Sequence, residues 1–216
     1  MPRPARGFWT SWRGLALFLV LALAVSHAMR EGGPPITDIG GQPALAGILA
    51  DHASPGEGPM DGDVTLVVYT DYRCPICRGD APALARLAAR EKRVRILYKD
   101  WPILGPDSRA GARLALATAY QGRYVPVHHA LMAAPRLDEA GLRRALAEAG
   151  ADWDRAQADL ALHGAAIDML LAEHDREARA LGLPGTPGYV ANRFLAVGAM
   201  GDAGFSRIVS RARSML

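Results

Sequence analysis

The sequence contains very little cysteine, with only Cys74 and Cys77 among its 216 residues. Two cysteines allow one disulfide at most, which excludes the disulfide-dense scaffolds of small secreted proteins. They also exclude a structural zinc site, because such a site needs four ligands and the adjacent His128 and His129 lack the spacing of paired ligands. The chain is instead long enough to bury a sizeable core without covalent staples.

A strong excess of one charge is also missing. The 25 Lys+Arg and 22 Asp+Glu residues leave a formal net charge of +3, although the pI is near 9.1. So small an excess gives weak support for a nucleic-acid partner, and we expect none. Hydrophobic residues make up 50% of the chain and charged residues 22%, which excludes wholesale disorder.

The longest uncharged apolar stretch, Leu15 to Val25, is shorter than the roughly 20 residues that a membrane span needs. Three arginines and no acid precede it, and Ser26-His-Ala28 follows with the small-x-small pattern of a cleavage site. This arrangement is typical of a secretory signal peptide over residues 1–28. An uncleaved N-terminal anchor is the alternative, because Trp9 and Trp12 suit a membrane interface.

The basic pI belongs largely to this N-terminal segment. Cleavage after Ala28 removes three arginines and no acid, which leaves 22 basic and 22 acidic residues in the mature chain. The charge balance therefore says little about partners.

The next part of the chain predicts a linker followed by a βαβ unit. Residues 29–62 are rich in glycine and proline and predict a linker or N-terminal arm, with one short helix within residues 43–52. Two β-branched strands, Val64–Tyr69 and Val94–Tyr98, flank a helical stretch from Pro75 to Arg90. A helix of that length between two strands predicts that the strands run parallel.

A block of helices follows, and the chain ends with a hairpin and a helix. We expect Ser108 to cap the first helix of the block, and Asp202 to cap the terminal helix. We expect His163 and His174 to be exposed, and His128 and His129 to lie on a helix surface or partly packed, without a catalytic role. The expected helices cover residues 108–120, 127–132, 137–148, 152–163, 165–181 and 202–213, and the antiparallel hairpin joins strands 188–191 and 194–197.

Cys74-Pro-Ile-Cys77 lies where the first strand is expected to end and the next helix to begin. Pro75 suits the first turn of a helix, where its missing N–H would be unpaired anyway. The helix N-terminus offers N–H donors and a partial positive charge to Cys74, and both favour its thiolate form. Cys77 lies about one turn further on, where burial would make it the resolving thiol of a disulfide-exchanging pair.

Two other uses of the cysteine pair are possible. A purely stabilising disulfide is disfavoured, because a loop of two residues constrains little entropy of the unfolded chain. Binding of a soft metal such as Cu(I) by Cys74 and Cys77 is the non-enzymatic alternative.

Several motifs together resemble the DsbA-like thiol:disulfide oxidoreductases, a family with the thioredoxin fold. Thr70-Asp-Tyr-Arg-Cys-Pro-Ile-Cys77 looks like the family's active-site segment, and Pro82 matches the proline that kinks the active-site helix. Leu183-Pro-Gly-Thr-Pro-Gly-Tyr-Val190 looks like the loop that carries the cis-proline, at Pro187. Tyr98-Lys-Asp-Trp-Pro-Ile-Leu-Gly-Pro106 resembles the segment that opens the helical insertion of exported members.

The resemblance implies an α/β protein with a thioredoxin-like fold and an inserted helical subdomain. The signal peptide or anchor would cover residues 1–28 and the linker or arm residues 29–62. The thioredoxin-like domain would then consist of residues 63–107 and 183–216, with the helical insertion at 108–182 between them.

In this family the cis-proline loop packs beside the cysteine pair, and the residue before the proline binds an extended client segment through its backbone. This is strand addition, which gives affinity with little sequence demand. Pro184 is the alternative position for the cis-proline. The implied site residues are the catalytic Cys74 and Cys77, the dipeptide Pro75 and Ile76 between them, and the substrate-binding Thr186 and Pro187.

One position departs from the family pattern. Many relatives carry an acid in the first strand, below the active site, as a proton acceptor for the resolving cysteine. The matching position here is Val68, and the nearest carboxylate, Asp71, lies in the approach to the helix. Lys99 or water is the alternative acceptor, and the sequence leaves this open.

The resemblance implies an exported, periplasmic enzyme that catalyses disulfide formation, with no cofactor beyond the Cys74–Cys77 disulfide and no metal. The proline after Cys74 favours an oxidase, whereas the threonine before the cis-proline also occurs in isomerase-like and reductase-like relatives. The implied partners are cysteine-containing client proteins and a membrane redox partner that reoxidises or reduces the pair. The oligomeric state stays open, and residues 29–62 are the place for an assembly arm.

Overall fold

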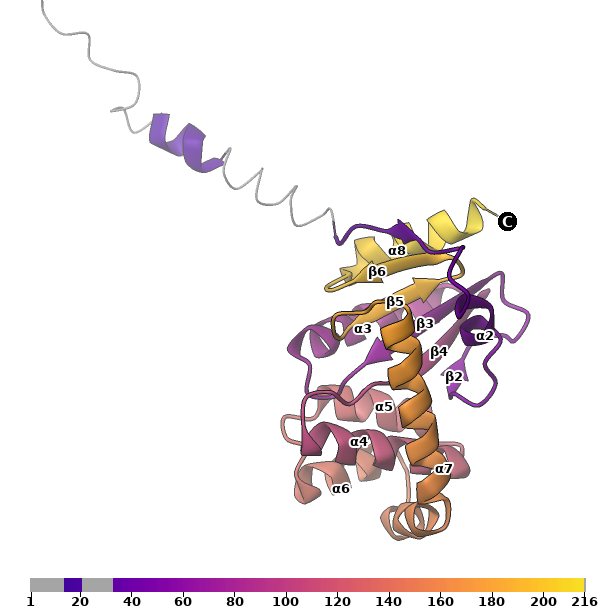
Figure 1. Cartoon of the computed structure of the whole chain (residues 1–216). Helices are drawn as coiled ribbons and strands as arrows, with labels where there is room; N and C mark the ends of the chain where they lie inside the picture. The colour runs from indigo at the N-terminus through magenta and orange to yellow at the C-terminus, as the bar shows by residue number, and fades with distance from the viewer. Residues whose placement is uncertain (1–13, 21–32, 216) are drawn as a thin grey trace, which may run out of the picture. The chain divides into compact units, whose positions relative to one another are not determined.

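The computed structural model describes residues 14–20 and 33–215 (Figure 1). The chain divides into two units, Met1–Gly33 and Pro34–Leu216. Residues 14–20 of the first unit are helical, while most of the predicted signal peptide, including its cleavage site, lies outside the described residues. None of the helices in the described ranges is long and apolar enough to cross a membrane.

The second unit contains a six-stranded mixed sheet with the strand order β1-β6-β5-β3-β4-β2. The central strands β3 (Val64–Thr70) and β4 (Val94–Asp100) run parallel and are joined by α3 (Pro75–Arg90), as the βαβ pattern predicts. Strands β5 (Gly188–Ala191) and β6 (Phe194–Val197) form the predicted antiparallel hairpin, which pairs with β3 through β5.

Both faces of the central sheet are covered. On β3, Leu66 and Val68 join the hydrophobic core that α3 shares with α8 (Gly201–Arg213), whereas Val67 and Tyr69 join the core on the opposite face. Because alternate residues of a strand point to opposite faces, burial of both faces explains why this strand is a continuous apolar run.

Residues 34–62, which were expected to form a linker or arm, add two short strands and a helix to the unit. β1 (Thr37–Asp38) pairs with β6, and β2 (Gly56–Glu57) pairs with β4. Between them, α2 (Leu45–Leu49) is buried at two positions against the core under the sheet. Strands of two residues show no periodicity in the sequence, and for this reason β1 and β2 were not predicted.

A Cβ on Gly56 would lie 2.3 Å from the Ile96 carbonyl oxygen, so this glycine marks a close approach of the β2 and β4 backbones.

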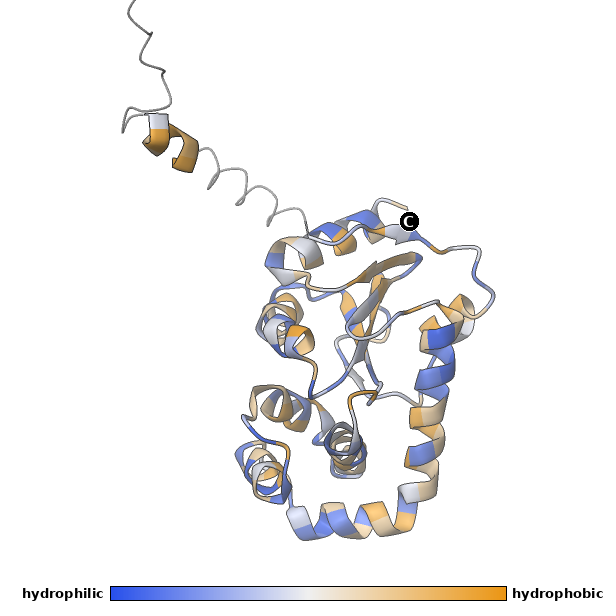
Figure 2. Cartoon of the chain, turned by 60° about the vertical axis from the view of Figure 1, so that its left-hand side comes forward, coloured by the Kyte–Doolittle hydropathy of each residue, from blue (hydrophilic) through white to orange (hydrophobic). Residues whose placement is uncertain are grey.

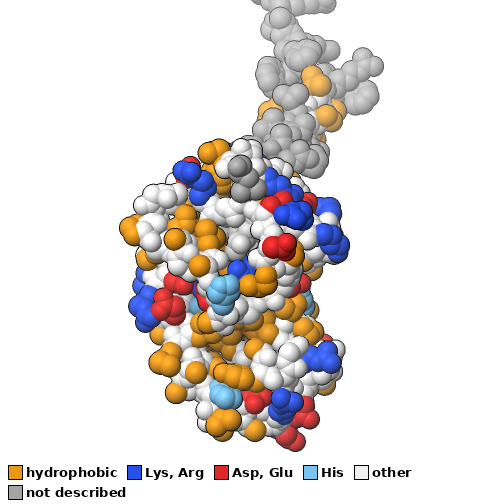
Figure 3. All heavy atoms as spheres, turned by 90° about the vertical axis from the view of Figure 1, so that its right-hand side faces the viewer, with side chains coloured by type: hydrophobic (Ala, Val, Ile, Leu, Met, Phe, Trp, Pro, Cys, Tyr) orange, Lys and Arg blue, Asp and Glu red, His pale blue; other side chains and the backbone are white. Residues whose placement is uncertain are grey.

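The predicted helical block lies between β4 and β5 in the chain. It consists of α4 (Pro106–Ala117), a 3₁₀ turn at Thr118–Gln121, α5 (Tyr124–Ala133), α6 (Glu139–Glu148) and α7 (Trp153–Ala180). The expectation of two helices over 152–181 was wrong, because α7 is continuous over 28 residues. Figure 2 shows that α7 changes direction partway along, and Figure 3 shows hydrophobic side chains exposed on the side that carries α2 and α7.

The helix caps predicted at Ser108 and Asp202 were wrong. Ser108 lies inside α4, where its hydroxyl donates to Asp71. Asp202 lies in the first turn of α8 and pairs with Arg86 of α3. The first N–H groups of α8 are bound instead by the carboxylate of Asp80, from α3. A cap supplied by a distant helix leaves no local signal, and for this reason the sequence pattern missed it.

Candidate active site

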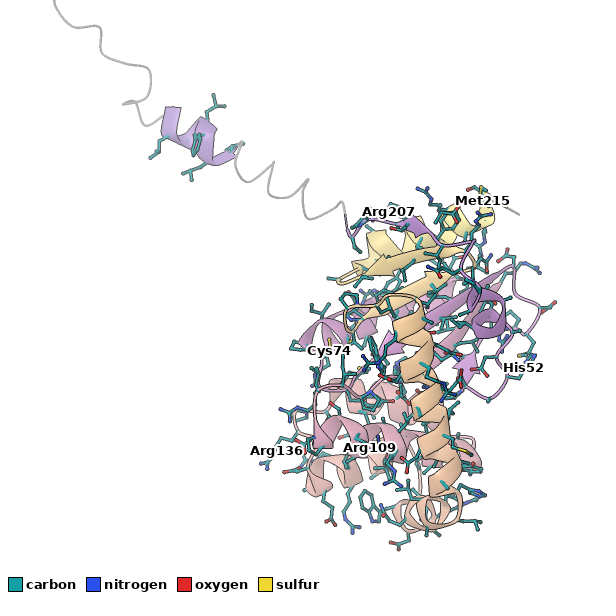
Figure 4. All side chains as sticks on the ribbon, viewed as in Figure 1. His52, Cys74, Arg109, Arg136, Arg207 and Met215 are labelled. Carbon is teal, nitrogen blue, oxygen red and sulfur yellow. The ribbon has the colours of Figure 1, made fainter. Side chains whose placement is uncertain are left out.

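Cys74 is the N-cap residue of α3, with an extended backbone (φ −70°, ψ 117°), and Pro75 occupies the first turn. The N–H of Cys77 donates to the Cys74 sulfur at 3.3 Å, and the Cys74 N–H donates to the Asp71 carbonyl at 3.0 Å. The motif therefore lies at the predicted junction of strand and helix, where the helix N-terminus faces the sulfur of Cys74. Figure 4 labels Cys74 at the start of α3, above the helical block.

The two thiols are free and have different surroundings. Burial and the neighbouring Cys74 thiol together raise the pKa of Cys77 to about 12, against the lowering effect of the Asp71 backbone and the Thr70 side chain. Cys77 is therefore a protonated thiol at neutral pH. The sulfur of Cys74 instead accepts a hydrogen bond from the first turn of the helix.

The loop with the predicted cis-proline lies directly beside Cys74. The Thr186–Pro187 peptide bond is cis, and the Cys74 thiol donates to the Thr186 carbonyl at 3.4 Å. The fold thus brings together two motifs that lie 112 residues apart in the sequence.

Exposed apolar side chains surround this junction. Ile76 is 46% exposed, next to Cys74 in the chain, and Ile103 is 40% exposed and lies against Gly185 of the cis-proline loop. Leu104 is also exposed, and its N–H donates to Asp71 in the active-site turn. Another polypeptide with exposed hydrophobic side chains could contact Ile76, Ile103 and Leu104 together.

Asp71 holds the active-site turn in place. It is buried, and it accepts hydrogen bonds from the Arg73 N–H, the Leu104 N–H and the Ser108 hydroxyl at 2.6–2.9 Å. Its carboxylate ties the turn to the start of the helical block, a role that its position in the sequence did not reveal.

No acid takes the place of Val68 on its own strand. Val68 pairs with Tyr189 of β5, whose hydroxyl donates to Asp80 at 2.9 Å. Burial raises the pKa of Tyr189, with further contributions from Asp80 and from the charges of both cysteines. The Asp80 carboxylate, with Tyr189 and two N–H groups of α8 as donors, is a fully hydrogen-bonded anchor.

Lys99, the alternative acceptor considered for Cys77, is fully buried on the opposite face of the sheet. Its ammonium contacts Asp51 and lies 2.9 Å from Glu177 of α7. Three further side chains bind this group, namely Tyr69, Ser54 and His174. We call these six residues the Lys99 cluster. The expectation that His174 is exposed was wrong, because its ring bonds Ser54 and the Asp100 carbonyl.

A second buried polar group lies on the active-site face and was missed by sequence reasoning. The Tyr124 hydroxyl donates to Asp100 at 3.0 Å, and the Tyr72 hydroxyl lies 3.0 Å from Nδ1 of His128. We call these four residues the Asp100 cluster. Burial raises the pKa of Asp100 to about 7, against the lowering effect of the Tyr124 and Tyr72 hydroxyls. The alternation of β4 contained the signal, because Asp100 lies two residues after Tyr98 and shares its face.

The expectation that His128 and His129 lie on a helix surface or partly packed was wrong for His128. His128 is buried, and burial lowers its pKa to about 3, whereas His129 is partly exposed. Within the part of the chain that the structure describes, no group of three or more His, Cys, Asp or Glu side chains could hold a metal ion.

Residues 65–207 match the model of the DSBA-like thioredoxin domain. The crystal structure of a thioredoxin-like oxidoreductase from Silicibacter pomeroyi DSS-3 superposes with a TM-score of 0.73 and 34% identity, over 77% of this chain and 96% of that one. The thiol-disulfide exchange protein alpha-DsbA2 from Wolbachia pipientis shares the fold, with a TM-score of 0.73 and 23% identity over 80% of this chain and 92% of its own.

Among curated sequences, the Na(+)/H(+) antiporter NhaA 3 of Salinispora tropica is 32% identical over 114 residues. The match covers 51% of this chain but only 17% of the antiporter, so the chain spans a small part of that relative's length.

The family match contains the cysteine pair, the helices α4 to α7 and the cis-proline loop. It confirms the predicted resemblance and the thioredoxin-like fold. The chain belongs to the DSBA-like thioredoxin domain family.

Proposed function

We propose that the chain is an exported enzyme that forms disulfides in cysteine-containing client proteins. Cys74 exchanges with the client, and Cys77 opens or closes the disulfide behind it. The position of Cys74 carries this assignment, since its sulfur faces the N-terminus of α3 and lies beside the Thr186 carbonyl.

Oxidation of a client then proceeds by two thiol–disulfide exchanges. A client thiolate attacks the Cys74 sulfur of the oxidised pair, the Cys74–Cys77 bond breaks, and Cys77 takes the electron pair and a proton. A second client thiolate attacks the client sulfur of the mixed disulfide, and Cys74 leaves as a thiolate. The client loses two electrons and the pair gains them. A membrane redox partner would reoxidise the pair.

Thr186 and Pro187 are the proposed client-binding residues. The Thr186 carbonyl already accepts a hydrogen bond from Cys74, so a client strand bound to this backbone would present its cysteine to that sulfur. The exposed Ile76, Ile103 and Leu104 suit an unfolded client with accessible apolar side chains. Backbone pairing of this kind places little demand on the client sequence.

Replacement of each cysteine tests the assignment. Cys74→Ser should reduce oxidation of a dithiol peptide to the uncatalysed rate. Cys77→Ser should attack the disulfide form of the same peptide through Cys74, which releases one peptide thiol, and the mixed disulfide should accumulate because no resolving thiol remains. Full oxidase and reductase activity in Cys74→Ser would refute the proposal.

The reduction potential of the Cys74–Cys77 pair decides the direction. A value near −120 mV is typical of a strong oxidant and is the expected result, whereas a value near −270 mV would assign a reductase instead. A dimeric or trimeric mass in solution would favour an isomerase. Export predicts that the protein is recovered from the periplasm, with Met29 as its first residue if the signal peptide is cleaved.

A further inference from the structure

Cys77 needs a proton donor each time it leaves the disulfide. Burial raises its pKa to about 12, so an unprotonated Cys77 is a poor leaving group. Val68 cannot supply a proton, and Lys99 binds two carboxylates on the other face of the sheet. The carboxylates of Asp80 and Asp71 are also committed, because each accepts three hydrogen bonds.

Asp100 is the remaining buried acid on this face of the sheet. It pairs in register with Thr70 of β3, and both side chains are buried. Neighbouring strands are about 4.8 Å apart, so paired residues on one face lie side by side. The Thr70 side chain in turn lowers the pKa of the Cys77 thiol, which places it as a neighbour of that thiol. Among the described residues, Oδ1 of Asp100 has no hydrogen-bond partner, although its other oxygen binds Tyr124.

Tyr72 can stabilise Asp100 after it has lost a proton. The single hydroxyl proton of Tyr72 has two possible acceptors, Nδ1 of His128 and the Asp100 carboxylate, and it lowers the pKa of the latter. A protonated Asp100 leaves Tyr72 bound to His128. An ionised Asp100 attracts the hydroxyl, which lies two residues before Cys74 in the active-site turn.

We propose that Asp100 stores the proton that Cys77 takes up and releases, and that the Thr70 hydroxyl passes this proton between them. Asp100 exchanges this proton with Cys77 only through Thr70, so we class it as a positioning residue. The proposal rests on the exchange chemistry assigned to Cys74 and Cys77 under the proposed function.

In the oxidising direction, the proton moves as the disulfide opens. A client thiolate attacks the Cys74 sulfur, a bond forms between them, and the electron pair of the broken Cys74–Cys77 bond goes to the sulfur of Cys77. The Thr70 hydroxyl gives its proton to Cys77 and takes the proton of Asp100. Asp100 is left as a carboxylate and accepts the Tyr72 hydroxyl. The reducing direction is the reverse, with Asp100 as the proton acceptor.

Titratable groups face Asp100 from several elements. Those on its own side of the sheet belong to the active-site turn, α3, α5 and β4, while one from α7 reaches its backbone carbonyl. They are Asp71, Tyr72, Cys77, Tyr98 with its partner Glu57, Tyr124, His128 and His174.

The test measures how fast reduced glutathione opens the oxidised Cys74–Cys77 pair, by acid quench and mass spectrometry from pH 5 to pH 9. Rates are divided by the fraction of glutathione thiolate. The wild-type rate should fall above about pH 7, where Asp100 ionises. In Asp100→Asn, the rate below pH 7 should fall on the order of a hundredfold, and the break near pH 7 should vanish. A wild-type profile in Asp100→Asn would overturn the proposal.

Two further variants keep the test decisive. Thr70→Val removes the relay hydroxyl and should abolish the same pH break, so it replaces Asp100→Asn if that variant does not fold. Asp80→Asn is the matched control, a buried acid near the cysteines that should lower stability and leave the pH profile unchanged. Loss of the break in Asp80→Asn as well would refute a specific role for Asp100. A wild-type protein without any exchange would instead refute the proposed function.

Discussion

Lys99 and Asp100 are neighbours in the chain, yet their side chains belong to two buried polar clusters on opposite faces of the sheet. In the Lys99 cluster, the ammonium lies between two carboxylates, and the polar side-chain atoms of all six residues have hydrogen-bond partners. In the Asp100 cluster, one carboxylate oxygen has no partner in the described part of the chain, and the acid has a raised pKa.

The difference separates a structural network from one suited to proton transfer. A buried polar group that is fully paired rigidifies the fold, whereas an incompletely paired one costs free energy. The Lys99 cluster ties the segment after α2, and α7, to β4 on the face of the sheet opposite the cysteines. The Asp100 cluster lies under the active-site turn, where a local cost in stability is typical of a functional site.

The largest expected effect comes from removing the cation of the Lys99 cluster. Lys99→Met leaves Asp51 and Glu177 buried without their counter-charge, which should lower the free energy of unfolding by about 3–5 kcal/mol in urea titrations. Lys92→Met is the matched control, because Lys92 is exposed and should change stability by less than about 0.5 kcal/mol. A loss below about 1 kcal/mol in Lys99→Met would contradict a structural role.

The second prediction concerns how stability depends on pH. The raised pKa of Asp100 means that the folded state holds a proton that the unfolded state has lost, so its contribution weakens as pH rises from about 4 to about 7. His174 and His128 act in the opposite sense. Burial lowers their pKa values to about 4 and about 3, so their contribution strengthens as pH rises towards 6.5.

Asp100→Asn should separate these two contributions. Its free energy of unfolding should rise more steeply with pH between 4 and 7 than that of the wild type, by up to a few kcal/mol across the range. Urea titrations at intervals of half a pH unit measure the slope. Equal slopes in the two proteins would show that Asp100 ionises normally in the folded state.

The smallest effects compare one hydroxyl from each cluster. Tyr69→Phe removes a hydrogen-bond donor to Glu177, but Glu177 keeps its ion pair with Lys99. The free energy of unfolding should therefore fall by about 1 kcal/mol, with no change in the pH profile of exchange. Tyr124→Phe removes a donor to Asp100, so it should raise the pKa of that acid and move the exchange break to higher pH. If the pH at which the exchange rate falls moved in Tyr69→Phe and not in Tyr124→Phe, the roles assigned to the two clusters would be reversed.

Sequence reasoning succeeded where the signal is local. The β-branched runs predicted β3 and β4, and Pro75 after Cys74 predicted the start of α3. It failed where the partner is remote. The edge strands β1 and β2 are two residues long, the cap of α8 comes from Asp80 in another helix, and the continuity of α7 depends on packing along its length.

The sequence by itself located the proposed redox centre, because the position of two cysteines at a strand-to-helix junction is defined by neighbouring residues. Only the tertiary structure decided which groups surround Lys99 and Asp100. Strand alternation sends the two side chains to opposite faces. The groups that pair with them, Asp51, Glu177 and Tyr124, lie 48, 78 and 24 residues away in the chain. Whether a buried charge is paired or left available depends on contacts over such distances, and no local pattern encodes them.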